Sequence, residues 1–523
     1  MTGPHSSVMD IMAWLRQYAP ASLQRDLQAD SRRVGAGDVF IALPGVAVAR
    51  AAGGSDGRDF IGAAVALGAA AVIAEADGWV ARDVGVPLLP VRGLRLLLGQ
   101  LAARFYGNPS ERLLSIGVTG TNGKTSCTHW IAQSLAGSAR CAVIGTVGSG
   151  FADSVLAHSP LTTPDAIGLQ RELARLEAEG ARAVAMEVSS IGLDQGRVNG
   201  MKFDIALFTN LTRDHLDYHG SMAAYEAAKT ILFDWPTLTH AVVNLDDPAG
   251  RRLAERLRDR ARGGTVRVIG TSLASERDDA FNGVLAARLT AHSIRATASG
   301  LAFEVKLERT DHDPAVMPVE VELVGLFNVA NLLGVFGVLL ACGVSLEQAT
   351  AAAPSLVVPA GRMQRVTAPG APLAVIDYAH TPDALEKALA ALRPMVQARG
   401  GRLWVVFGAG GDRDAGKRAP MGEAAAAADC IVITSDNPRG EDPAAIVEAI
   451  AAGVPAARFA AQECERVIDR AQAIARTLRA ARAADVVLIA GKGHEAYQEA
   501  GGQRLPFSDV VHARAAIAQR SHA

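Results

Sequence analysis

The chain has 523 residues, of which 49% are hydrophobic and 20% are charged, and its formal net charge is −2 at pH 7. A globular chain of this length exceeds what one hydrophobic core supports, so we expect about three domains. The near-neutral charge and the lack of a basic run argue against a nucleic-acid partner and against binding to a membrane surface.

Cysteine usage and the N-terminal residues bear on the compartment. The five cysteines are scattered, and no two of them form a C-x-x-C pair. This pattern favours reduced thiols in a cytoplasmic protein over a disulfide framework or a zinc site. The first residues lack a charged region followed by an apolar core, so the sequence predicts no signal peptide. The most apolar stretch, 334–344, is too short to span a bilayer.

The N-terminal part, residues 1–92, shows one α/β pattern. We expect a strand at 38–43, a helix at 60–67 and a second strand at 69–74. Ser31 lies just ahead of a glycine turn and, taken alone, is typical of a solvated loop. The small-residue loop between Gly45 and Gly57 is expected to be mobile.

The stretch LLSIGVTGTNGKTS, residues 113–126, is the clearest functional signal. A buried strand at 113–118 ends in a turn containing Gly120 and Gly123, and Lys124-Thr125 then open an amphipathic helix. Glycines let backbone N–H groups approach phosphates, the helix N-terminus favours negative charge, and a Thr hydroxyl can ligate Mg²⁺. The spacing is one residue longer than G-x-x-x-x-G-K-[ST], and an ordinary strand-to-helix turn is the alternative. The stretch predicts an ATP site.

Alternating strands and helices continue to about residue 357. We expect further strands near 141–145, 182–188, 204–209 and 240–244, and such alternation is typical of a mostly parallel sheet. After residue 283 the period changes to two, so segments 293–298, 301–307 and 319–323 predict an antiparallel ribbon. A helix at 328–342 closes this region.

A junction containing Pro and Gly, residues 354–362, precedes a third α/β region. Its expected strands are 373–377, 402–407, 430–434 and 485–490, with helices between them, which is typical of a doubly wound, Rossmann-like fold. The predicted class is α/β with three domains: a small N-terminal α/β domain (1–92), a central P-loop-type domain with the ribbon (93–357), and a Rossmann-like C-terminal domain (358–523).

Polar residues follow several of these strands. Glu187 and Ser189 follow the third strand of the central domain, and His215 lies in the polar run TNLTRDHLDYHG after the fourth. Ligands of open parallel sheets bind beyond the carboxyl ends of the strands, and Mg²⁺ prefers carboxylate, hydroxyl and phosphate oxygens. Each residue alone also has an ordinary structural explanation; Thr162-Thr163, for example, could simply cap a helix.

Lys229 and four segments of the third region are further candidates. By default Lys229 is a solvated helix lysine, but its apolar neighbours would lower its pKa if it pointed inward. Segments 377–380, 411–413, 436–439 and 491–495 all follow apolar runs, so we expect them to line one edge of a sheet.

The chain resembles the Mur ligase family, the ATP-dependent amino-acid ligases that build the peptidoglycan stem peptide. The runs TGTNGKT, MEVSS, TNLTRDHLDYHG, YEAAK, DYAHTP, DNPRGEDP and GKGHE match in order over essentially the whole chain. The resemblance implies that ATP phosphorylates a substrate carboxylate and that an amine then attacks the acyl phosphate. The DNPR form implies that the added amino acid is meso-diaminopimelate and that the acceptor is UDP-N-acetylmuramoyl-L-Ala-D-Glu. The family resemblance further implies a monomer that acts in the cytoplasm with ATP and Mg²⁺. It implies neither a nucleic-acid partner nor insertion into a membrane.

The resemblance also implies roles for residues around ATP. The phosphates would be held by Gly120, Thr121, Asn122, Gly123, Lys124, Thr125 and Ser126. Asn328 and Asn331 match an adenine-side motif, and Arg362 and Asp377 match nucleotide-contacting positions. The magnesium shells would include Thr125, Glu187, His215 and Lys229, the last as a carbamate. Lys124, Lys229 and His215 are the implied catalytic residues.

Two further groups match substrate contacts in the family. Contacts to the UDP-muramoyl dipeptide would come from Ser31, Thr162, Thr163, Ser189, Gln195 and Arg197. Contacts to the incoming amino acid would come from Arg413, Asp436, Asn437, Pro438, Arg439, Gly491 and Glu495. Two departures stand out: the family's S-S-H-G-L has Ile191 in place of the His, and the uridine-side loop between Gly45 and Asp56 is lengthened.

Three alternatives remain open at this point. The lysine-adding ligase of the same family carries other residues at the position of Arg439. Folylpolyglutamate synthetase shares the phosphate cradle but would leave the DNPR run and the N-terminal domain unexplained. An ATP-gated switch protein would leave Glu187 and His215 without a chemical role.

Overall fold

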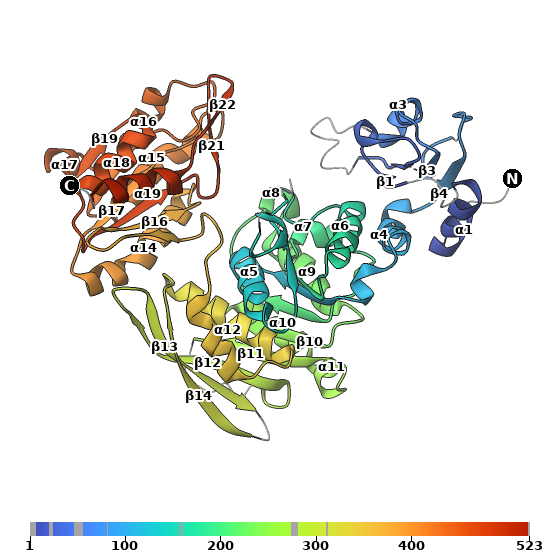
Figure 1. The fold of residues 1–523 in the computed structure, drawn as a ribbon, viewed down its shortest axis with the longest axis horizontal. Helices are drawn as coiled ribbons and strands as arrows, with labels where there is room; N and C mark the ends of the chain where they lie inside the picture. The colour runs from blue at the N-terminus through green and yellow to red at the C-terminus, as the bar shows by residue number, and fades with distance from the viewer. Residues whose placement is uncertain are drawn as a thin grey trace. The chain divides into compact units, whose positions relative to one another are not determined.

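The computed structural model describes residues 7–19, 25–45, 56–80, 82–154, 156–157, 161–273, 281–309 and 312–520. Its ribbon is drawn in Figure 1. The chain separates into two compact units, the first made of residues 1–271, 277–288 and 337–343, and the second of residues 272–276, 289–336 and 344–523. Within the described ranges, no helix combines the length and apolar character needed to cross a membrane.

The first unit begins with a small parallel sheet, drawn in blue in Figure 1. Its strand order is β1 (Leu27–Gln28), β2 (Val39–Ala42), β3 (Ala71–Glu75) and β4 (Leu88–Val91). The associated helices are α1 (Val8–Tyr18), η1 (Ser31–Arg33), η2 (Gly57–Phe60), α3 (Ile61–Ala66) and α4 (Leu94–Phe105). Apolar residues of α1 and α4 pack on one face of this sheet, and those of α3 pack on the other. The predicted elements are present, whereas positions 46–55 of the predicted mobile loop lie outside the described residues.

A larger sheet follows in the same unit. Seven of the ten strands of this sheet run in the order β11 (Arg267–Ser272), β10 (His240–Asn244), β9 (Ile205–Phe208), β5 (Leu114–Thr119), β8 (Ala183–Glu187), β6 (Cys141–Gly145) and β7 (Gly148–Phe151). Only β7 pairs antiparallel among these strands. All five strands predicted for this sheet are confirmed. Because β5 lies between β8 and β9, the polar residues after these three strands meet at one edge.

The helices of this region are α5 (Lys124–Leu135), α6 (Ala166–Ala178), α7 (Ser190–Asp194), α8 (Leu216–His219), α9 (Met222–Thr230), α10 (Pro248–Arg256) and α11 (Arg258–Arg262), with η3 (Pro109–Glu111) and η4 (Ile231–Asp234). Apolar residues of α6, η4 and α10 form one core with alternate residues of β6, β8, β9 and β10.

The antiparallel ribbon is present, but its predicted boundaries were wrong. Its strands are β12 (Leu285–Ala296), β13 (Leu301–Arg309) and β14 (His312–Val321). β12 begins well before residue 293, because its first residues, LAARL, lack the alternation that marks a strand in the sequence. β14 begins before residue 319; its first seven residues, HDPAVMP, lie mostly at the surface and include two prolines, so they show no alternation of apolar and polar residues. The helices that follow are α12 (Leu326–Ala341), α13 (Leu346–Ala352) and η6 (Ala353–Ser355).

The C-terminal part of the second unit is a six-stranded sheet. Its order is β15 (Gln364–Val366), β16 (Leu373–Asp377), β20 (Val486–Ala490), β17 (Leu403–Phe407), β18 (Cys430–Ile433) and β19 (Cys464–Arg466). Helices α14 (Pro382–Arg399), α15 (Arg418–Ala425) and α16 (Pro443–Ala451) cover one face, and α18 (Arg470–Ala480) and α19 (Asp509–Arg520) cover the other. The remaining elements are η7 (Ala415–Lys417), α17 (Ala456–Ala460) and the hairpin β21 (Tyr497–Ala500) with β22 (Gln503–Pro506). This is the doubly wound fold that the sequence predicts.

Candidate active site

The phosphate-cradle loop joins β5 to α5. Gly120 has a φ of 147°, and a Cβ at this position would clash with the side chain of Thr209. Gly123, with a φ of 87°, is the left-handed residue from which α5 begins. The Lys124 ammonium donates hydrogen bonds to the backbone oxygens of Gly120 (2.8 Å) and Thr121 (2.9 Å). The lysine therefore lies over a glycine loop at a helix N-terminus, which is the arrangement an anionic phosphate requires.

The segment after β9 holds this loop in place. The backbone N–H of Asn122 donates to Asn210 Oδ1 at 2.9 Å, and that of Thr212 donates to Thr121 Oγ1 at 3.0 Å. The Thr121 hydroxyl also lies 3.1 Å from the hydroxyl of Tyr225 on α9. The run TNLTRDHLDYHG, which the sequence predicts at the carboxyl edge of the sheet, therefore supports the phosphate-cradle loop through these hydrogen bonds.

A buried carboxylate lies beside the first turn of α5. The Thr125 hydroxyl donates to Glu187 Oε1 at 2.9 Å, and Glu187 is only 1% exposed. Thr146 donates to the same carboxylate through its backbone N–H (2.8 Å) and its hydroxyl (3.2 Å), and its hydroxyl is 3.0 Å from that of Thr162. The prediction did not include Thr146, although its place directly after the strand 141–145 could have indicated it.

Lys229 points inward, so its interpretation as a solvated lysine is wrong. Its side chain is 2% exposed, and its ammonium donates to the backbone oxygen of Gly120 at 2.9 Å and lies 4.4 Å from the centre of the Tyr225 ring. Burial lowers the pKa of Lys229 from 10.5 to about 6; the positive charge of Lys124 adds to this effect and Asp214 opposes it. At neutral pH the side chain is therefore mainly an uncharged amine.

His215 is placed differently from Glu187. It is half exposed, has a φ of 52°, donates its backbone N–H to Asp214 Oδ1 at 2.8 Å, and holds its ring 6.1 Å from that of Tyr225. No group of three or more His, Cys, Asp and Glu side chains in the described ranges could by itself hold a metal ion. A magnesium site here would therefore combine Glu187 with hydroxyl and phosphate oxygens.

Four of the residues predicted to contact the dipeptide form one hydrogen-bonded group. Ser189 donates its backbone N–H to Thr163 Oγ1 at 2.9 Å, and Arg197 donates to the backbone oxygen of Thr163 at 3.1 Å. Arg197 also donates to Gln195 Oε1 at 2.6 Å. The hydroxyl of Ser189 caps α7, as an ordinary helix N-cap would. Ser31 lies in η1, and no described hydrogen bond joins it to this group.

Position 191, where the family has a histidine, is occupied by half-buried Ile191. The neighbouring Ser190 hydroxyl lies 3.0 Å from Nε2 of His219, which comes from α8. Burial lowers the pKa of His219, and the negative charge of Asp194 opposes this effect. A histidine from another element therefore lies beside Ser190, the residue before this position.

The second unit holds the residues predicted on the adenine side of the nucleotide. Asn328 and Asn331 are both buried on α12, and the Asn331 amide donates to Asn328 Oδ1 at 3.3 Å. Asp377 accepts the backbone N–H groups of Met363 and Ala379, both at 2.9 Å. Burial raises the pKa of Asp377, although these hydrogen bonds oppose the rise.

A cluster of charged and amide side chains lies at the carboxyl ends of β18 and β20. The Asn437 amide donates to Glu495 Oε2 at 2.9 Å, and Asn437 Oδ1 accepts from the ammonium of Lys492 at 2.9 Å. The same ammonium donates to Glu495 Oε2 at 3.0 Å and lies 3.6 Å from Asp436 Oδ1. The predicted Asp436, Asn437 and Glu495 are thus brought together. Lys492 lies in the candidate segment 491–495, but the sequence analysis assigned it no contact to a substrate.

Arg439 lies at the rim of this cluster. Its guanidinium donates to the backbone oxygen of Gly411 at 2.7 Å, and its Nε lies 3.5 Å from Glu499 Oε2. Arg439, which follows Pro438, has a φ of 52°. A positive φ is unusual for a residue with a side chain, and strained positions of this kind concentrate at functional sites. Arg413 is exposed on the neighbouring loop, which also carries Gly411.

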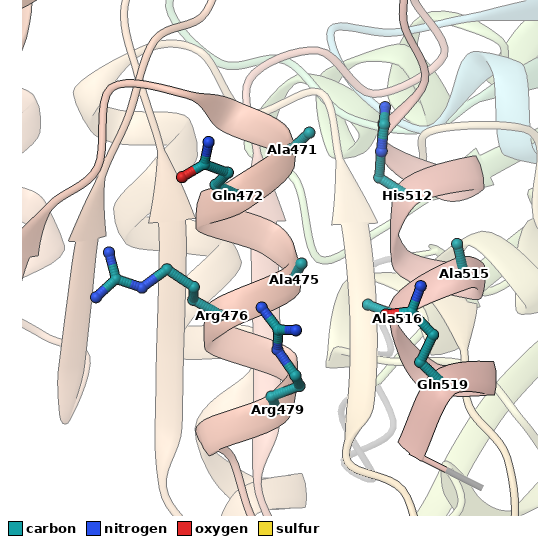
Figure 2. A pocket seen from close by; sticks show the side chains of 9 residues that line it. All are labelled: Ala471, Gln472, Ala475, Arg476, Arg479, His512, Ala515, Ala516 and Gln519. Atoms are coloured by element: carbon teal, nitrogen blue, oxygen red, sulfur yellow. The ribbon is translucent and has the colours of Figure 1, made fainter. Parts of the chain in front are cut away.

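A separate pocket of about 420 Å³ lies between α18 and α19 (Figure 2). Alanines line its floor, and Arg476, Arg479 and His512 stand at its sides (Figure 2). None of the predicted site residues lines this pocket, and it lies on the face of the sheet covered by α18 and α19. It is therefore not part of the candidate site.

Comparison with known families matches three consecutive stretches of the chain. Residues 26–106 match "Mur ligase family, catalytic domain", residues 118–339 match "Mur ligase middle domain", and residues 361–493 match "Mur ligase, glutamate ligase domain".

Curated proteins and a solved structure resemble the chain over its whole length. It is 47% identical to the UDP-N-acetylmuramoyl-L-alanyl-D-glutamate–2,6-diaminopimelate ligase of Janthinobacterium sp. (strain Marseille), covering 98% of both chains. It is 49% identical to the protein of the same name from Ralstonia nicotianae, covering 98% of this chain and 96% of that one. A solved structure under that name is 35% identical, with a TM-score of 0.69 over 97% of this chain and 99% of the other.

Proposed function

This chain belongs to the Mur ligase family, and from that premise we propose that it adds meso-diaminopimelate to UDP-N-acetylmuramoyl-L-Ala-D-Glu. It is an ATP-dependent amide ligase that forms ADP and phosphate and acts in peptidoglycan precursor synthesis. The observation that carries the proposal is the full-length likeness to relatives named for this reaction. The proposal places the enzyme in the cytoplasm, as a monomer whose partners are these small molecules.

The reaction has two bond-forming steps. A γ-carboxylate oxygen of the D-Glu residue attacks the γ-phosphorus of ATP, and the bond to ADP breaks. The amine of the incoming amino acid then attacks the acyl carbon, loses a proton, and phosphate leaves with the former carboxylate oxygen. Carboxylate oxygen is a poor leaving group and phosphate is a good one, so the chain's own task is to position the reactants and to balance charge.

The cradle loop supplies the contacts to the phosphates. The backbone N–H groups around Gly123 and the start of α5 face an anion favourably, and Ser126 adds a half-buried hydroxyl in the first turn. Lys124 exchanges its hydrogen bonds to the Gly120 and Thr121 carbonyls for the β- and γ-phosphates. Its charge offsets the negative charge that gathers between nucleotide and carboxylate.

Magnesium fits the donors on the other side of this loop. The hydroxyl of Thr125 and the carboxylate of Glu187 are hard oxygen ligands held 2.9 Å apart, and the threonine lies in the helix turn that faces the phosphates. Bound Mg²⁺ neutralises phosphate charge. His215 and carbamylated Lys229 complete the proposed set.

Lys229 is suited to carbamylation because its amine is uncharged near neutral pH. The lone pair of the amine forms a bond to the carbon of CO₂, and a proton leaves to water. The product is a carboxylate-like group beside Gly120, at a position where the chain itself offers only a neutral amine.

The second unit supplies the site for the amino acid. Diaminopimelate differs from lysine by a carboxylate at the far end of its side chain, and the planar guanidinium of Arg439 can bind that group through two parallel hydrogen bonds. Lysine would present an ammonium to the same guanidinium, which disfavours the lysine-adding alternative. Asp436, Asn437 and Glu495 provide oxygen acceptors for ammonium groups, and Arg413 adds a cation on the adjoining loop.

The UDP-muramoyl dipeptide is assigned to residues of the first unit. Thr163 donates its hydroxyl to the backbone oxygen of Glu187 at 2.9 Å, and Thr162 is linked to the Glu187 carboxylate through Thr146. Ser189 and Arg197 bond to Thr163, and Arg197 bonds to Gln195, so a carboxylate held by this group lies near the cradle. Ser31 serves the nucleotide end of the same substrate.

Phosphate release measured with one substrate omitted at a time tests the proposal. Release should require ATP, Mg²⁺, the UDP-muramoyl dipeptide and diaminopimelate together. A switch protein would release phosphate without the amino acid, and a folate ligase would require folate and glutamate instead; either outcome would contradict the proposal.

A further inference from the structure

The fully buried lysine at the end of β20 has no role in the reaction as described so far. Lys492 is 0% exposed, and its ammonium contacts three side chains that the proposed function places around diaminopimelate. We propose that Lys492 is the positioning residue that fixes Asp436, Asn437 and Glu495 as the acceptors for the incoming amino acid. This inference rests on the proposed function and adds a residue to it.

Exposure places Lys492 behind the binding surface. The side chain of Glu495 is 21% exposed and that of Asp436 is 9% exposed, whereas that of Lys492 is 0% exposed. A ligand that approaches from solvent meets Glu495 first and cannot touch the ammonium. Lys492 therefore acts through its neighbours.

The ammonium also decides which way the Asn437 amide points. Asn437 Oδ1 accepts from Lys492 (2.9 Å) and from the backbone N–H of Glu499 (3.0 Å), so the NH₂ group must point to Glu495 Oε2, to which it donates at 2.9 Å. Glu495 Oε2 accepts from Lys492 as well, at 3.0 Å. With Oε2 fixed by two donors, the carboxylate of Glu495 is held in one orientation.

Charge gives the second reason for a cation here. Asp436 and Glu495 both carry carboxylates beside the same ammonium, and Glu495 belongs to the loop that follows β20. Without Lys492 the two carboxylates would repel each other in a poorly solvated place and would move apart. This movement would displace the acceptors for the ammonium groups of a diamino acid.

Glycines on both sides of Lys492 allow its contact with Asp436 and Glu495. β20 ends at Ala490, and Gly491 has a φ of 116°. A Cβ at Gly491 would lie 2.5 Å from Asp436 Oδ2, so only glycine lets the chain pass this carboxylate closely enough for Lys492 to lie beneath it. Gly493, also at positive φ, turns the chain back so that Glu495 faces the same cluster.

Steady-state kinetics of the full chain with Lys492→Met and Lys492→Gln tests the proposal. Methionine keeps the length and removes all donors, whereas glutamine keeps two N–H donors without the charge. We expect Lys492→Met to raise the KM for diaminopimelate about tenfold or more, with the KM values for ATP and the muramoyl dipeptide within twofold of wild type. The KM of Lys492→Gln for diaminopimelate should lie between those of wild type and Lys492→Met. Lys387→Met, which removes an exposed lysine of α14 in the same unit, is the matched control.

Several results would overturn the assignment. One is an active Lys492→Met enzyme whose KM for diaminopimelate stays within twofold of wild type; another is a parallel rise in the KM for ATP, which would indicate general structural damage. If Lys492→Met does not fold, Lys492→Gln decides alone, and wild-type kinetics in that variant would refute the role. A wild-type enzyme that does not use diaminopimelate at all would instead refute the proposed function. Wild type and the Lys387→Met control are measured in the same assay, so failure of the proposed function is distinguished from failure of the role of Lys492.

Discussion

Substituting Lys229 by methionine should reverse the usual effect of removing a buried side chain. The folded chain holds the amine, with a pKa of about 6, whereas the unfolded chain holds the ammonium up to its ordinary pKa of 10.5. The unfolded state therefore binds more protons between these values, and the contribution of Lys229 to stability rises with pH across this window. The slope is about 1.4 kcal/mol per pH unit.

The magnitude at a working pH follows from the same values. At pH 8, deprotonating the ammonium on folding costs about 3 kcal/mol, given the ordinary pKa of 10.5. Methionine fills a similar volume and loses only the hydrogen bond to Gly120, worth about 1 kcal/mol. Lys229→Met should therefore be more stable than wild type at pH 7 to 8, and this advantage should shrink as the pH rises.

Urea unfolding followed by far-UV circular dichroism measures this difference from pH 6.5 to 9 in buffers freed of CO₂, so that the amine stays unmodified. Lys387→Met, at an exposed ion pair, serves as the control, and its difference from wild type should not follow the same slope. A wild-type-to-Lys229→Met difference that is constant over this pH range would refute the account, because it would show that Lys229 keeps its proton in the fold.

Three further substitutions have defined outcomes. Lys124→Ala should lower kcat by roughly 10²–10³-fold or more without changing the thermal midpoint, because it removes a charge from the phosphates and little packing; full turnover by a folded variant would exclude this role. Arg439→Ala should raise the KM for diaminopimelate tens-fold or more, as a lost charge-assisted pair costs about 2–5 kcal/mol, with the KM for ATP unchanged; unaltered diaminopimelate kinetics would count against it. Arg470→Met should destabilise the chain by about 3–5 kcal/mol in urea unfolding, since it leaves the fully buried Asp509 without its cation; a loss below 1 kcal/mol would show that the carboxyl is neutralised in another way.

The sequence predicts the parallel strands well because their apolar runs are buried on both faces. Strands such as β5 and β20 are short, mostly apolar, almost wholly buried and followed by glycine, so the sequence shows where they end and which polar residues come next. Several strands were not predicted. Three of them, β1, β15 and β19, have only two or three residues, which is too few to show a period. Longer strands, among them β4, β7 and β11, were missed as well. The domain boundaries at 92 and 357 stay predictions.

Within the site, the sequence predicts where the polar residues lie relative to the strands, but it does not predict their hydrogen-bond partners. The sequence places Glu187 and Asn437 after strands, yet it does not show that Thr146 binds the first or that Lys492 binds the second. Lysine is rarely buried, so the sequence favours a solvated position for Lys229 and gives no sign that Lys492 is enclosed. Only the packing of neighbouring strand ends shows that both are enclosed.

The most direct test of the account follows one oxygen atom. The UDP-muramoyl dipeptide is prepared with ¹⁸O in both oxygens of its γ-carboxylate, and the phosphate released during addition of diaminopimelate is examined by mass spectrometry. An acyl-phosphate route predicts that each phosphate carries a single ¹⁸O from the carboxylate, with the tripeptide product formed in equal amount. Phosphate without the label would show that ATP is hydrolysed by water, which would contradict the ligase mechanism.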